Sequence, residues 1–130
     1  MFDYKDLIGI PFVDRGRDPK VGLDCFGLAK EVFRWHGIDL PEFWIACEDA
    51  SQINRTVGEE KKSGRWARLE KPEVPCLIVL RFNAYKWNHV GVYIGSGRMI
   101  HTARKTGGRI ERLDHPYWRQ RIEGYYIPKR

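Results

Sequence analysis

A change of residue pattern at Pro75 constrains the fold of this 130-residue chain more than any other feature. Before Pro75, apolar residues recur at helical spacing, most clearly over residues 28–36. After Pro75, short segments rich in Val, Ile and Tyr predict strands over residues 76–82, 89–94, 98–103, 109–113 and 124–127. Helices followed by an antiparallel meander indicate an α+β fold.

The first half of the chain contains one strong helix prediction. This helix begins after Asp24, whose side chain can serve as the N-cap, and ends at Gly37. A short helix is expected over residues 4–8 and a weaker one over residues 42–57. Loops are predicted over residues 12–23 and 55–71, and turns at residues 95–97 and 107–108. The chain length suits one domain, so we expect residues 1–130 to form a single unit.

Composition narrows the classes of function. Hydrophobic residues make up 42% of the chain, which is enough for a packed core. The net charge of +6 comes from 23 basic residues interspersed with 17 acidic ones. A mixture of both signs favours an ordinary solvated surface, and no recognition motif supports a small nucleic-acid-binding domain, so we expect no nucleic-acid partner.

Other features argue against cofactors and membranes. The three cysteines, which are Cys25, Cys47 and Cys76, match no zinc-binding spacing, and no nucleotide-binding loop is present. We therefore expect no metal and no cofactor. The N-terminal segment lacks the apolar core of a signal peptide, and no apolar run reaches transmembrane length. We expect cytoplasmic synthesis without a signal peptide and no insertion into a membrane.

Cys25 is the candidate nucleophile, because it is predicted to lie in the first turn of the helix after Asp24. The dipole at a helix start lowers the pKa of a thiol, and a nearby imidazole can hold it as a thiolate. His89 is the candidate general base, and His101 is the candidate residue that orients His89. In this arrangement Gly27 would keep the space above the helix start open, and the backbone N–H of Cys25 could stabilise an oxyanion.

The geometry of this site depends on the turn between the two histidine strands. A two-residue turn at Ser96 and Gly97 would put His89 and His101 on opposite faces of the hairpin. An odd-length loop centred on Gly95 would place His89 directly opposite His101 on one face. The site forms if that shared face packs against the start of the cysteine helix.

Several motifs resemble those of the NlpC/P60 family of papain-like cell-wall peptidases. Residues 24–28 are similar to the family's Asp-Cys-Ser-Gly-Leu, and residues 9–12 to its Gly-Xaa-Pro-Tyr. Residues 89–101 resemble its His-Val-Gly-Ile-Tyr-Leu-Gly and Phe-Ile-His segments, with the same spacing between the histidines. The closing residues 118–126 resemble the end of short versions found among bacteriophage tail components. Ordered motifs at matching spacing are far more specific than any single motif.

The resemblance implies a papain-like fold in which N-terminal helices pack on a small antiparallel sheet. It also implies hydrolysis of peptide bonds in peptidoglycan stem peptides, typically the γ-D-glutamyl bond to a diamino acid, without a cofactor. Cys25, His89 and His101 match the family's nucleophile, base and orienting positions.

Three further residues match positions near the substrate. Asp24 matches a family position that helps to shape the substrate pocket and can meet a free amino group of the stem peptide. Phe26 replaces the usual serine, and Phe12 replaces a tyrosine whose hydroxyl often helps. We therefore expect Asp24, Phe26 and Phe12 to contact the substrate and the pocket beside the thiol to be altered.

The similarity to tail components also implies a setting. We expect a phage or prophage tail component whose partners are peptidoglycan stem peptides and other tail proteins, and whose destination is the virion tail. One alternative is a structural tail assembly protein with the same fold and little or no activity. Another is an amidase or acyltransferase of related mechanism, because the nucleophile does not dictate the acceptor.

Overall fold

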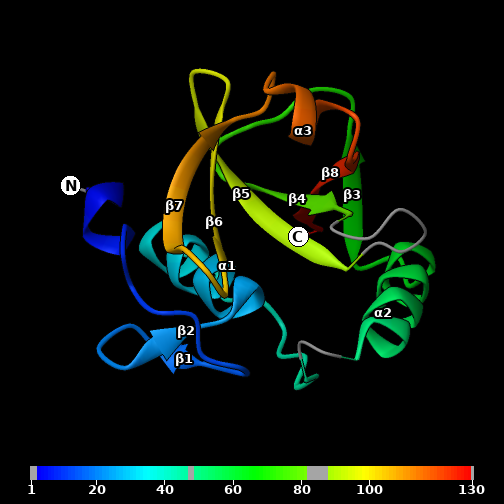
Figure 1. Ribbon diagram of the computed structural model, residues 1–130. Helices are drawn as coiled ribbons and strands as arrows, with labels where there is room; N and C mark the ends of the chain where they lie inside the picture. The colour runs from blue at the N-terminus through cyan, green and yellow to red at the C-terminus, as the bar shows by residue number, and fades with distance from the viewer. Residues whose placement is uncertain (1–2, 47–48, 82–87, 130) are drawn as a thin grey trace.

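A six-stranded antiparallel sheet occupies the centre of the structure (Figure 1). In spatial order its strands are β3 (Trp66–Leu69), β8 (Ile122–Pro128), β4 (Cys76–Leu80), β5 (His89–Gly95), β6 (Arg98–Ala103) and β7 (Gly107–Arg112). The computed structural model describes residues 3–46, 49–81 and 88–129. The predicted α+β class is confirmed. Within these ranges, no helix has the length and apolar character needed to cross a bilayer.

The helix α1 (Cys25–Trp35) begins where the sequence predicts. The backbone N–H of Gly27 donates to Asp24 Oδ1 at 2.7 Å, which is the N-cap bond. Gly37 follows the helix with φ of +78°, a conformation that stops a helix at little cost for glycine. The buried stripe of α1 packs against β5 and β6 and consists of Leu28, Ala29, Val32 and Phe33. Burial of each large side chain contributes about 1.5–3 kcal/mol.

The opposite face of the sheet carries a second apolar cluster. Its buried members are Ile78, Leu80, Met99, Leu113 and Trp118. Trp118 belongs to α3 (Pro116–Arg119), a single turn that the sequence did not predict. The two faces of the sheet are therefore covered by different segments, α1 on one side and the segment around α3 on the other.

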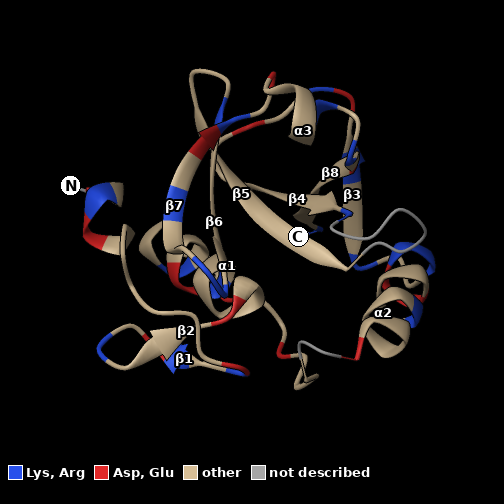
Figure 2. Ribbon diagram, viewed as in Figure 1, with Lys and Arg blue, Asp and Glu red and all other residues tan. Residues whose placement is uncertain are grey.

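The predicted helix over residues 42–57 and loop over residues 55–71 are both misplaced. The helix α2 (Ala50–Lys62) begins later because Asp49 caps it, accepting from the backbone N–H of Gln52 at 3.1 Å. It also continues through a charged stretch, where Lys and Arg are interspersed with Asp and Glu (Figure 2). The rest of the predicted loop contains β3, whose pairing partner β8 lies far along the chain. Residues 47–48 lie outside the described residues.

Smaller differences concern the edges of the fold. The helix over residues 4–8 is a 3-10 helix, η1 (Tyr4–Leu7). The predicted loop over residues 12–23 contains a short hairpin of β1 (Arg17–Asp18) and β2 (Gly22–Leu23). Gly107 and Gly108 begin β7 instead of forming a turn, and Gly108 exchanges backbone hydrogen bonds with residues 9 and 10. The strand predicted to reach residue 82 ends at residue 80 in β4, and residue 82 lies outside the described residues.

Candidate active site

Cys25 and His89 line one cavity of about 370 Å³. Cys25 is the first residue of α1, and His89 is the first residue of β5. The backbone N–H of Val90 donates a hydrogen bond to the Cys25 sulfur, so the start of β5 lies directly beside the thiol. The structure therefore brings together the predicted nucleophile and the predicted base.

His101 also joins the site, through a direct contact with His89. His89 Nε2 and His101 Nδ1 lie 2.8 Å apart, and both side chains are buried. The pairing of Val92 with Ile100 sets His101 beside Gly91, so the two histidines are diagonal neighbours and not directly opposite each other as predicted. A Cβ at Gly91 would lie 3.4 Å from the Cβ of His101, so glycine leaves the space across which the rings meet.

The hairpin combines parts of both predicted turns. Ser96 and Gly97 have φ of +55° and +71°, which is the two-residue turn expected to separate the histidines. However, β5 carries an extra residue between Tyr93 and Gly95, where the register with β6 shifts. Such a bulge moves the rest of the strand by one residue and so returns both histidines to one face.

The face that carries the histidines does not pack on the buried stripe of α1. The α1 stripe packs against the other face, whereas the histidine rings contact Trp118, a member of the second apolar cluster. The His101 ring lies edge-on to the Trp118 ring with centroids 4.9 Å apart, and the His89 ring stacks on it at 6.0 Å. The histidines are thus held by Trp118, and only His89 reaches the cavity that contains Cys25.

The sequence pattern does not predict a fourth polar residue of the site, Glu111 on β7. Its Oε2 lies 2.5 Å from His101 Nε2. The available signal was a carboxylate in the strand segment that follows His101, but its proximity depends on the pairing of β6 with β7. Glu111 therefore extends the polar chain beyond the three predicted residues.

The electrostatic environment favours a neutral thiol and neutral imidazoles. Desolvation raises the pKa of Cys25 to about 12, and the charge of Asp24 adds to the increase, although the hydrogen bond from Val90 opposes it. Burial holds the pKa of His89 well below 6.5, and His101 lowers it further. The expected resting thiolate is therefore not supported, and a nucleophilic role for Cys25 would require another group to accept its proton.

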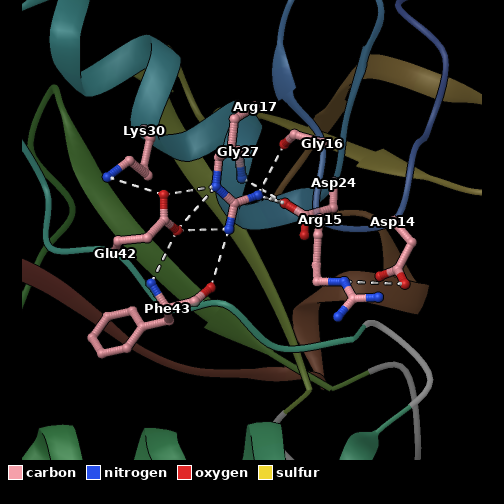
Figure 3. Close-up of polar contacts among 9 residues, drawn as sticks. All are labelled: Asp14, Arg15, Gly16, Arg17, Asp24, Gly27, Lys30, Glu42 and Phe43. Carbon is pink, nitrogen blue, oxygen red and sulfur yellow. Dashed lines mark hydrogen bonds and ion pairs between the residues drawn. The ribbon is translucent and has the colours of Figure 1, made fainter.

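Arg17 holds together the segments beside the start of α1 (Figure 3). Its Nη1 donates to Asp24 Oδ1 at 2.7 Å and to the carbonyl of Gly16 at 2.9 Å. Its Nη2 donates to Glu42 Oε1 at 2.8 Å and to the carbonyl of Phe43 at 3.1 Å. The guanidinium thus connects the segment that contains Glu42 and Phe43 to the start of α1. It also forms an ion pair with the Asp24 carboxylate.

The three predicted substrate-binding residues all line the cavity. Phe26 packs edge-on against Phe43 with ring centroids 5.3 Å apart, and Phe12 lies under the guanidinium of Arg104 at 5.2 Å. These rings make the walls beside the thiol apolar. The contact of Asp24 with a substrate amino group stays a prediction, since Oδ1 already accepts two hydrogen bonds within the protein.

The helix α2 provides one wall of the cavity, although the sequence predicts a loop for its second half. Lys61 lines the cavity and forms an ion pair with Glu123 on β8 at 2.8 Å. Glu123 also accepts a hydrogen bond from Tyr126 at 2.7 Å. These contacts fix α2 to the sheet and so define the width of the cavity.

Gly27 serves close packing, not the open space that was expected. A Cβ at this position would lie 2.0 Å from the carbonyl oxygen of Gly16. We expect Gly27→Ala to lower the free energy of unfolding by about 1–3 kcal/mol, because the loop that carries Arg17 must move. Urea unfolding measures this change.

Gly58, in α2, provides the matched control for that prediction. A Cβ there meets nothing within 4 Å, so Gly58→Ala should stabilise the protein by about 0.5–1 kcal/mol. Equal effects of the two substitutions would contradict the close packing at Gly27.

The described residues contain no group of three or more His, Cys, Asp or Glu side chains that could hold a metal ion. Cys76 is buried in β4 and carries a free thiol. Cys47 lies outside the described residues.

Comparison with known proteins gives a consistent result. The NlpC/P60 family matches residues 9–126. The chain is 31% identical to a gamma-DL-glutamyl hydrolase of Bacillus subtilis over 94% of its own length and 27% of that protein. It is 27% identical to the murein DD-endopeptidase MepS/murein LD-carboxypeptidase of Escherichia coli K12, over 93% of its own length and 57% of that protein. The chain thus spans only part of these relatives.

Solved structures support the fold. An NlpC/P60 family protein from Bacillus cereus matches with a TM-score of 0.65 and 24% identity, over 94% of this chain and 36% of that one. An NLP/P60 family lipoprotein-like protein from Staphylococcus aureus matches with a TM-score of 0.63 and 23% identity, over 95% of this chain and 38% of that one. The predicted arrangement of helices on a small antiparallel sheet is therefore confirmed at the level of the fold.

Proposed function

This chain belongs to the NlpC/P60 family, and on that premise we propose that it is a cysteine hydrolase that cuts peptide bonds in peptidoglycan. The observation that carries the proposal is the shared cavity of Cys25 and His89, together with the 2.8 Å contact between His89 and His101. The named activities of the relatives, a gamma-DL-glutamyl hydrolase and a murein endopeptidase, support this class of substrate.

The proposed reaction proceeds through a thioester. The Cys25 sulfur attacks the carbonyl carbon of the scissile bond while His89 accepts the thiol proton. His89 then donates this proton to the leaving amine, and the amide bond breaks. Water attacks the thioester with His89 again as base, which releases the new carboxyl group and restores the thiol. The apolar walls around Phe26 and Phe12 exclude water from the first step.

The scissile bond proposed is the γ-D-glutamyl bond to the diamino acid of the stem peptide. Purified peptidoglycan is digested with the protein, and the released peptides are identified by mass spectrometry. New peptides that end in γ-D-glutamate support this bond, whereas separation of cross-linked stems without such ends supports DD-cleavage. An unchanged peptide pattern would reject the peptidase proposal and favour the structural alternative.

We propose further that the protein acts as a phage or prophage tail component, made in the cytoplasm and carried to the wall by the virion. The similarity of residues 118–126 to short tail-associated members supports this setting. Proteomic analysis of purified virions tests it, and absence of the protein from particles would reject it.

The pH profile of hydrolysis tests the protonation states described above. His89 must be neutral to act as base, and its lowered pKa keeps it neutral in mildly acidic solution. We therefore expect kcat/KM to remain constant as the pH falls to 6.5, the usual pKa of histidine, and to decrease only below it. Because the pKa of Cys25 is about 12, its ionisation should add no inflection between about pH 7 and pH 9. An acid limb at or above pH 6.5 contradicts this expectation.

A further inference from the structure

Glu111 occupies the end of a continuous chain of polar contacts. His89 Nε2 lies 2.8 Å from His101 Nδ1, and His101 Nε2 lies 2.5 Å from Glu111 Oε2. The Trp118 side chain also hydrogen-bonds to Glu111, and Arg109 Nε lies 3.7 Å from the same carboxylate oxygen. Two side chains from two elements, Trp118 of α3 and Arg109 of β7, therefore hold this carboxylate against His101.

These contacts determine the position of each proton. An ionised carboxylate can only accept hydrogen bonds, so His101 must carry its proton on Nε2. His101 Nδ1 is then an acceptor, and His89 must donate to it from Nε2. The remaining nitrogen of His89, Nδ1, is consequently unprotonated, which is the form that a base requires.

We propose that Glu111 is a positioning residue that sets the tautomers of His101 and His89 and stabilises the positive charge that forms when His89 takes the Cys25 proton. This inference rests on the proposed function, because it concerns the activation of the same thiol. Glu111 does not line the cavity that contains Cys25, and its influence passes through His101.

The charges around the two histidines support this role. Burial lowers the pKa of His101, while the hydrogen bond and charge of Glu111 raise it and Arg109 lowers it. Burial alone would raise the pKa of Glu111, but the hydrogen bonds from His101 and Trp118, together with the charges of His101 and Arg109, lower it below the usual value. Other titratable groups nearby include Cys25, at the cavity shared with His89, and His115 and Tyr117, in the groove beside Glu111.

The substitution Glu111→Gln tests the proposal, because glutamine has the same shape but no charge and can donate a hydrogen bond to His101 Nε2. We expect kcat/KM to fall by about 10- to 100-fold, mainly through kcat. We also expect the acid limb of the pH profile to move to lower pH, since a charge that favours the imidazolium is lost. Asp114→Asn is the matched control, because Asp114 is exposed and pairs with Arg112.

Two readouts separate positioning from a merely structural role. Long-range ¹H–¹⁵N spectra of the histidine rings should show Nε2-protonated tautomers in the wild type and a mixture in Glu111→Gln. The rate at which iodoacetamide alkylates Cys25, followed by mass spectrometry of its peptide, should fall about tenfold in the variant near pH 7. Alkylation needs no peptidoglycan, so it tests the inference even if the wild type fails to cleave peptidoglycan.

The outcomes are distinct. A lower kcat with shifted tautomers and slower alkylation supports the inference. A lower kcat with unchanged tautomers and an unchanged acid limb overturns it in favour of a structural role. Unchanged kcat and alkylation overturn it outright. The wild type could also cut no peptidoglycan while Glu111→Gln still alters the tautomers and slows alkylation. That result would support the role of Glu111 and reject the proposed function.

Discussion

Replacing Cys25 with alanine is expected to abolish the digestion of peptidoglycan, with a loss of at least about 10³-fold in kcat. No thioester can form without the sulfur, and the cavity offers no equivalent nucleophile at the start of α1. Release of soluble peptides from purified peptidoglycan measures the loss. Cys25→Ser replaces the thiol with a hydroxyl of similar size. This variant should also be nearly inactive, because a hydroxyl is a far weaker nucleophile than a thiol.

Cys76→Ala provides the control for the loss of a thiol. Cys76 is buried in β4 and does not line the cavity, so its substitution should leave kcat unchanged. Urea unfolding of all three variants separates lost chemistry from lost stability. Retention of full activity by Cys25→Ala would reject the proposed mechanism, whatever the substrate proves to be.

Replacing His89 with glutamine is expected to lower kcat/KM by about 10²- to 10⁴-fold, the usual contribution of a general base. The loss should be large because the pKa of the Cys25 thiol is about 12, so few thiolates form without a base. Glutamine retains much of the volume that stacks on Trp118, which limits the effect on packing. Steady-state kinetics on a defined stem peptide measure the change.

His36→Gln is the matched control for a lost imidazole. His36 lies at the end of α1, where its Nε2 is 2.9 Å from the hydroxyl of Tyr4, and it does not line the cavity. Its substitution should leave kcat/KM within about twofold of the wild type. If the two histidine variants lose activity equally, His89 is not the base, and the loss reflects the packing of the domain.

The local features of the site were predictable from neighbouring residues. Asp24 caps α1 because its side chain precedes a helical pattern, and both appear in one short stretch of sequence. The strands that contain His89 and His101 could be recognised by their β-branched residues and glycine turns. The predicted position of α2 differs from the observed one by several residues, because the polar composition of this helix provides little apolar periodicity.

The arrangement of these elements depended on contacts that the sequence does not display. A single extra residue in β5 decides whether the two histidines share a face of the sheet, and strand patterns do not reveal such a bulge. The face covered by α1 follows from the packing of two apolar clusters, not from either strand alone. Arg17 and Glu111 acquire their roles only when loops and strands distant in the chain come together.

The sequence by itself therefore determined the α+β class, the start of α1 and the choice of Cys25, His89 and His101 as candidate site residues, since these depend on short-range periodicity, capping and motif spacing. The tertiary structure decided how His89 and His101 meet, which residues wall the cavity and that Glu111 completes the chain of contacts. The physical reason is that side chains reach hydrogen-bond distance only after strand register and sheet faces are set, and both depend on the packing of the whole domain.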